Sequence, residues 1–135
     1  MAGYSGKSLK EKLGLTEDMS TLFMKAPAEY FAELGRRNAP YDDVDGEYDF
    51  IHAFYTSKED LSNYADILIS KLSDHGMLWI SWPKLSAQKD KSLDIDAVDI
   101  TEQDLRDILL PKGLVDVKVC AVTEVWSGLK FVWRK

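Results

Sequence analysis

The fold of this chain is decided by residues 48–82, YDFIHAFYTSKEDLSNYADILISKLSDHGMLWISW. Tyr48–Tyr55 has the apolar content of a strand, and Met77–Trp82 is the continuous apolar run typical of a strand covered on both faces. The residues between them carry apolar side chains at helical spacing, and Thr56 with Glu59 predicts a capping box at the helix start. A strand, a helix and a strand in this order predict a right-handed parallel crossover.

The end of this helix is expected near residue 73, because Gly76 can stop a helix before the following strand. His75 would then lie beside the last turn, where a cation is favoured by the negative end of the helix dipole.

The flanking sequence adds further elements on both sides of this unit. Ser8 with Glu11 predicts a capping box, Pro27 suits the first turn of a helix, and Thr101 is a typical N-cap. A turn through residues 126–128 predicts a closing antiparallel hairpin. The expected helices cover 8–13, 28–34 and a segment from Thr101 to Pro111, and the expected strands cover 19–26, 114–122 and 129–134.

Together these elements predict one α/β domain over residues 1–135. Its core would be a three-layer, Rossmann-like sheet of about five strands, mostly parallel with an antiparallel C-terminal strand. In the closing hairpin, LVDVKVCAV alternates, so that Val115, Val117, Val119 and Ala121 are expected to face one way.

Composition limits the classes of function. The 135 residues include 23 acidic and 17 basic side chains, and this net charge of −6 argues against a general nucleic-acid surface. Basic residues near the two termini leave one alternative open, which is nucleic-acid binding by a local basic patch. A single cysteine excludes an internal disulfide and gives no metal-site spacing. With no apolar run long enough for a signal peptide or membrane span, we expect a cytoplasmic protein without membrane contact.

Two short motifs invite a ligand assignment and fail on spacing. A phosphate-binding P-loop around Gly6–Ser8 would need a glycine where Met1 stands, and a strand before it. The acidic stretch 42–47 does not match a calcium loop, because aligning Gly46 with the invariant glycine puts His52 at the twelfth ligand position. No metal site is expected.

Open α/β sheets place their ligands at the carboxyl ends of their parallel strands. Lys25 ends the first strand, Tyr55 and Thr56 end the next, and Trp82 and Lys84 end the third. These five residues are the candidate ligand site, and an aromatic wall with a lysine would suit an anionic or planar ligand. The alternative is that Lys84 leaves the sheet edge into solvent while Trp82 packs in the core. No acid, base and nucleophile set accompanies them, so no catalytic residue is assigned.

Two other side chains, His52 and Trp126, have both a structural and a functional interpretation, and Cys120 has a structural one. His52 lies in an apolar strand, where it can be a buried histidine with a hydrogen-bonding partner or a general base that lacks a recognisable motif. Cys120 is most simply a small packed side chain. Trp126 in a turn is the candidate anchor for a protein partner, or else folds back over the hairpin to close the core.

The order of elements resembles the C-terminal half of the Rossmann-like methyltransferases that use S-adenosylmethionine (SAM). DFIHAFY looks like the fourth strand of that family, GMLWISWPK like the fifth, and GLVDVKVCAVTEVWSGLKFVWRK like the closing pair. The segments GYSGKSLKEKLGL, WPK and WSGLKFVWR also resemble a group of short uncharacterised bacterial proteins. The first resemblance implies the strand order 1-4-5-7-6 in methyltransferase labels.

The departures from the methyltransferase pattern bear most on function. That family has a glycine-rich turn after its first strand and an acidic residue at the end of its second. Here the corresponding turn, residues 25–29, has no glycine, and Pro27 supplies no N–H. Only twelve residues separate Gly35 from Tyr48, which is too few for the second strand, a helix and the third strand. No cofactor is therefore expected.

Two functions follow from this sequence. The first is a non-catalytic binding or regulatory module that acts through a protein partner. The second is a small-molecule-binding protein or enzyme, for a nucleotide or an anionic ligand, at the strand ends. Loss of the second and third strands would leave the first strand at a sheet edge, so a homodimer through that edge is expected.

Overall fold

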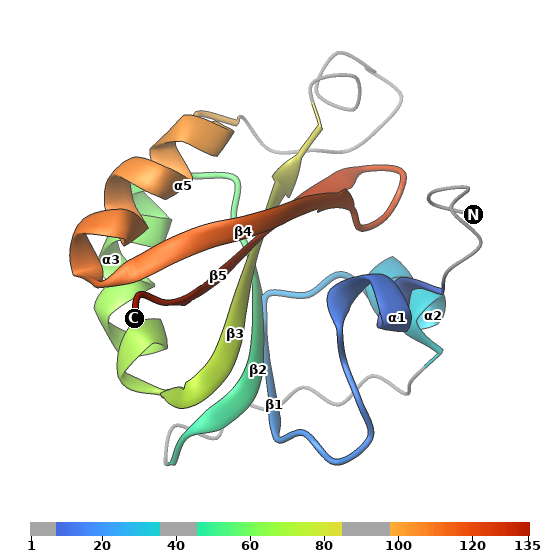
Figure 1. Cartoon of the computed structure of the whole chain (residues 1–135). Coiled ribbons are helices and arrows are strands. Elements are labelled where there is room, and N and C mark those ends of the chain that lie inside the picture. Colours follow the sequence, from blue (N-terminus) through green and yellow to red (C-terminus); the bar gives the residue numbers. More distant parts are fainter. Residues whose placement is uncertain (1–7, 36–45, 85–97) are drawn as a thin grey trace.

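The computed structural model describes residues 8–35, 46–84 and 98–135. Five strands form one sheet in the order β1-β2-β3-β5-β4 (Figure 1). β1, β2 and β3 pair in parallel, and β5 runs antiparallel to both β3 and β4. This confirms the predicted order and the antiparallel last strand. The strands are β1 (Thr21–Met24), β2 (Tyr48–Phe54), β3 (Leu72–Pro83), β4 (Leu114–Ala121) and β5 (Trp126–Trp133).

Helices cover both faces of this sheet, which makes three layers (Figure 1). One face packs against α1 (Leu9–Leu13) and α2 (Ala28–Leu34). The other packs against α3 (Lys58–Ser70) and α5 (Glu102–Leu109), and a short 3₁₀ turn, η1 (Leu110–Lys112), follows α5.

Alternation along the central strands divides the core into two. In β2, Ile51 and Ala53 face the α3/α5 layer, whereas Phe50 and Phe54 face the α1/α2 layer. Both faces of β2 and β3 are thus apolar, as a parallel sheet covered on two sides requires.

Two of the capping signals in the sequence are confirmed. Ser8 and Glu11 form the predicted capping box of α1, and Gly14 ends that helix with a left-handed φ of 76°. Thr101 caps α5, with Asp104 completing a capping box. Of the remaining motif residues, Gly6, Lys7 and the acidic residues 42–45 lie outside the described residues.

The boundary between α3 and β3 differs from the prediction. The N-cap is Ser57, whose hydroxyl accepts from the Asp60 N–H, and not Thr56. The helix ends at Ser70 and the strand begins at Leu72, so Gly76 lies inside β3.

The reason for a glycine at position 76 is close packing rather than helix termination. The register of β2 against β3 shifts between Tyr48 and Phe50. A Cβ at Gly76 would lie 2.9 Å from the Tyr48 carbonyl oxygen and 2.7 Å from Leu72 Cδ1, closer than side chains pack. His75 is consequently an exposed strand residue, and its predicted place at a helix end is wrong.

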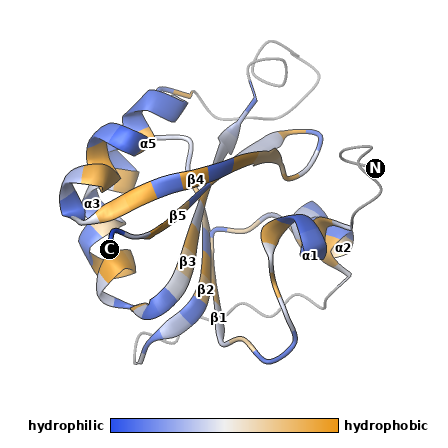
Figure 2. Cartoon of the chain, viewed as in Figure 1, coloured by the Kyte–Doolittle hydropathy of each residue, from blue (hydrophilic) through white to orange (hydrophobic). Residues whose placement is uncertain are grey.

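The closing hairpin forms, with two differences from the prediction. A bulge between Asp116 and Lys118 interrupts the alternation of β4, and Val117 and Val119 are both exposed. Hydrophobic and hydrophilic residues therefore share the outer surface of this edge strand (Figure 2). In addition, residues 126–128 belong to β5, so the turn precedes Trp126.

Within the described residues, we find no helix that combines the length and the apolar character needed to cross a membrane.

Candidate functional site

The carboxyl ends of four strands meet at one edge of the sheet. β1, β2 and β3 are parallel, and β4 points the same way because β5 is antiparallel to both β3 and β4. The turn between β4 and β5 therefore lies at the edge where open α/β sheets bind their ligands.

Lys25 lies at this edge in an unusual conformation. It directly follows β1, and its φ of 58° makes it the one non-glycine residue of the described chain with a left-handed backbone. Its Nζ lies 3.5 Å from Asp60 Oδ2, 5.4 Å from the centre of the Tyr55 ring and 6.0 Å from the centre of the Tyr64 ring. We call these four residues the Lys25 cluster.

The Lys25 cluster joins two predicted residues to two that the sequence reasoning missed. Lys25 and Tyr55 are strand-end residues, whereas Asp60 and Tyr64 stand one turn apart on α3. Burial, with smaller contributions from Tyr64 and Asp60, raises the pKa of Tyr55 well above its usual value, so its ring stays neutral. The four-residue spacing of Asp60 and Tyr64, which places them on one face of a helix, is the signal in the sequence that could have grouped them.

Thr56, Trp82 and Lys84 have other surroundings. The Thr56 carbonyl accepts from the Asp99 N–H at 3.1 Å. Trp82 is buried in the core on the α3/α5 side. The Lys84 N–H donates to the Val125 carbonyl at 2.8 Å and so extends the pairing of β3 towards the hairpin turn.

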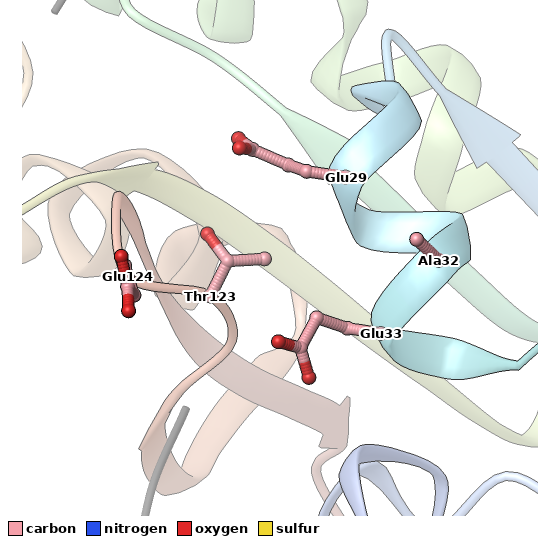
Figure 3. Close-up of a pocket in the computed structure, with 5 residues that line it drawn as sticks. All are labelled: Glu29, Ala32, Glu33, Thr123 and Glu124. Carbon is pink, nitrogen blue, oxygen red and sulfur yellow. The ribbon is translucent and has the colours of Figure 1, made fainter. Parts of the chain in front are cut away.

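A hollow of about 450 Å³ lies at the same edge, between α2 and the β4–β5 turn (Figure 3). Its lining residues are Glu29, Ala32, Glu33, Thr123 and Glu124. The predicted ligand residues are not among them. Three carboxylates give this hollow a negative potential, which disfavours an anionic ligand there.

A buried polar network centred on His52 lies between the sheet and α2. The Nδ1 of His52 is 2.9 Å from the Tyr30 hydroxyl, and Nε2 is 2.7 Å from Ser81 Oγ. The ring is fully buried and stacks on Phe54, with ring centres 4.4 Å apart. Burial lowers the pKa of His52 to about 3. The sequence interpretation of a buried histidine with hydrogen-bonding partners is the arrangement observed.

Trp126 and Cys120 both adjoin the core on the α1/α2 side. The Trp126 ring meets Phe54 edge-on at 5.2 Å, as expected if this tryptophan folds back over the hairpin. Cys120 is half-buried, and this burial raises the pKa of its thiol.

The described residues do not match the way the methyltransferase fold usually holds SAM. The turn after β1 carries Lys25 where a glycine would leave room for ligand, and Pro27 is the N-cap of α2 without an N–H to offer. In the described part of the chain, β1 pairs with β2 alone, so no neighbouring strand brings a ribose-binding carboxylate.

Comparison with known proteins gives structural matches alone. No protein-family model matches the sequence. No curated protein matches it either.

Methyltransferases are among the similar solved structures. A Sulfolobus solfataricus protein assigned to the type 11 methyltransferases matches with a TM-score of 0.61 and 12% identity, over 100% of this chain and 95% of its own. A SAM-dependent methyltransferase from Clostridium acetobutylicum matches with a TM-score of 0.53 and 10% identity, over 79% of this chain and 69% of its own. Magnesium protoporphyrin IX methyltransferase from Synechocystis, with bound S-adenosylhomocysteine (SAH), matches with a TM-score of 0.50 and 22% identity, over 68% of this chain.

This chain covers 47% of the Synechocystis enzyme, about half its length. At these identities the likeness concerns the fold. The strand order, the antiparallel closing strand and these matches together show that the chain has a methyltransferase-like Rossmann fold.

Proposed function

We propose that this chain is a non-catalytic binding or regulatory module built on a methyltransferase-like fold. The observation that carries this proposal is the turn after β1, where Lys25 adopts a left-handed backbone. A glycine at that position would let a cofactor approach the backbone, whereas the Lys25 side chain crosses this edge towards Asp60.

The buried network supports the same assignment. His52 and Ser81 lie 2.7 Å apart, a distance that would suit a base and a nucleophile. Both side chains are fully buried, so a substrate has no access to them. Their hydrogen bonds are better explained as satisfying polar groups inside the core.

Small-molecule binding at the carboxyl edge is the second candidate, and the hollow beside α2 favours it. Glu29, Glu33 and Glu124 line that hollow, and carboxylates attract cations. Nucleotides and other anions are therefore poorer candidates for the hollow than cationic molecules.

Titration with SAM and SAH tests the proposal. Isothermal titration calorimetry at about 1 mM ligand should give no saturable heat, and thermal unfolding should be unchanged. Were SAM bound, a concentration of about 100 times its dissociation constant would stabilise the fold by about 2.7 kcal/mol, a rise of several degrees in Tm.

A SAM-binding methyltransferase measured alongside provides the positive control. Saturable binding of SAM or SAH to this chain would contradict the proposal. It would also reopen the possibility of a catalytic role.

A further inference from the structure

We propose that Tyr55, Asp60 and Tyr64 form a cage for a methylated ammonium group, and that the chain's own Lys25 fills this cage in the structure. The cage gives the binding role proposed above a ligand class, and in that sense rests on it. Its test uses no SAM, so the two proposals can fail separately.

The geometry of the Lys25 ammonium defines the cage. Two aromatic rings lie within about 6 Å of Nζ, the range of a cation–π interaction. A carboxylate on the same helix as Tyr64 supplies the negative charge. Two rings and an acid around one cation are the elements of an aromatic cage, the arrangement that recognises quaternary ammonium ligands.

The Lys25–Asp60 distance favours a methylated cation over a primary one. At 3.5 Å, the separation of Nζ and Oδ2 is longer than the roughly 2.7–2.9 Å of a charge-assisted hydrogen bond. The hydrogen bond of the primary ammonium to this carboxylate is therefore a long one. A quaternary ammonium has no N–H, so it needs no hydrogen bond at this carboxylate and is held by charge and by the rings.

The cage has a buried part, which is fixed, and an exposed part, from which the Lys25 side chain can be displaced. Tyr55 is 2% exposed and belongs to the core, so its ring is a rigid floor. The Lys25 side chain is 51% exposed and the Asp60 side chain 46% exposed. Lys25 can thus leave towards solvent without disturbing the core, and an external cation can replace it.

The left-handed backbone identifies the substitution that empties the cage. At a φ of 58°, glycine is free of the strain that other residues carry, so Lys25→Gly removes the resident cation without straining the turn. Tyr64 is 40% exposed, so Tyr64→Ala removes one wall with little cost to folding.

The experiment is a titration with tetramethylammonium chloride, followed by two-dimensional ¹H–¹⁵N NMR at constant chloride concentration. We expect saturable shifts at residues of the cage in the wild type. In K25G the affinity should rise about tenfold, because a tethered competitor is gone. Y64A and D60N should each weaken binding to K25G about fivefold or more.

Matched controls separate the cage from general effects. Ile67→Ala removes a similarly exposed apolar side chain, at 46% against 40% for Tyr64, from the next turn of α3. Lys58→Ala removes an exposed lysine at the start of the same helix. Both should leave tetramethylammonium affinity within a factor of about two, since neither residue belongs to the Lys25 cluster.

Two results would overturn the proposal: no saturable shift in K25G, or equal affinities in K25G and K25G/Y64A. If the cage binds tetramethylammonium, choline and a peptide with a trimethylated lysine then distinguish the source of the cation. A small molecule is indicated if choline binds more tightly, and a modified protein if the peptide does. If neither binds more tightly than tetramethylammonium, the methylated ammonium group alone is what the cage recognises.

Discussion

At the scale of single residues, His52 couples the stability of this fold to pH. A neutral imidazole has one donor and one acceptor nitrogen, and the hydroxyls of Tyr30 and Ser81 satisfy both. Protonation would place an unpaired charge in the core. This is why burial lowers the pKa of His52 to about 3, against 6.5 for an unperturbed histidine. Below pH 6.5 the unfolded chain takes up a proton at His52, whereas the folded chain does not until about pH 3.

The free energy of unfolding should therefore fall as the pH drops below 6.5, by about 1.4 kcal/mol per pH unit from this residue. Urea unfolding at pH 7 and pH 5 measures the effect. Between these values the wild type should lose about 2 kcal/mol more than His52→Gln, which keeps a polar side chain but does not titrate. All other residues are the same in both proteins, so the difference between the two losses reports on position 52. Equal losses in the two proteins would show that His52 does not carry the dependence.

At the scale of elements, local signals were predictable and the α3–β3 boundary was not. The capping box of Ser8 with Glu11 acts within a few residues, so the sequence alone identifies it, whereas the N-cap expected at Thr56 lies one residue later, at Ser57. The end of α3 depends on pairing between strands distant in sequence: Leu72 lies opposite Tyr48, in a register that then shifts. Leu72 also continues the helical spacing of α3, so periodicity assigned it to the helix.

The close approach at Gly76 gives a test of that register. Gly76→Ala would place a Cβ 2.9 Å from the Tyr48 carbonyl oxygen, which belongs to the backbone and cannot rotate away. Overpacking of this kind should lower the free energy of unfolding by about 1–3 kcal/mol. The exposed Asp74 of the same strand provides the control, since Asp74→Ala should stay within about 0.5 kcal/mol of the wild type. A neutral Gly76→Ala would mean that this part of β3 pairs differently.

At the scale of the whole molecule, the sheet order was predictable and the site was predictable in part. One parallel crossover and one hairpin predict two strand pairs, the resemblance to the methyltransferases implied how these pairs join, and the short stretch after Gly35 puts β1 at the edge. The expectation that ligands bind at the carboxyl ends of parallel strands identified Lys25 and Tyr55. Periodicity gave no means of joining Lys25 to Asp60, 35 residues later, or α2 to the β4–β5 turn. Such contacts arise from packing between elements.

The two edges of the sheet differ in a way that favours one of them for self-association. β4 carries the bulge at Asp116 and an exposed Lys118, features that hinder edge-to-edge pairing. β1 is a regular strand that, among the described residues, pairs on its β2 side alone. We therefore propose that two copies of the chain pair through β1.

Light scattering after size exclusion, over a range of micromolar concentrations, should give twice the mass of the chain. Thr21→Lys places a charge at the start of β1 and should return a monomer, because lysine on an edge strand opposes pairing. Val119→Lys makes the same change at an exposed position of β4 and should leave the dimer intact. A monomeric wild type would refute the dimer. If Val119→Lys alone dissociated it, β4 would be the interface, and the bulge would have to be accommodated between the two copies.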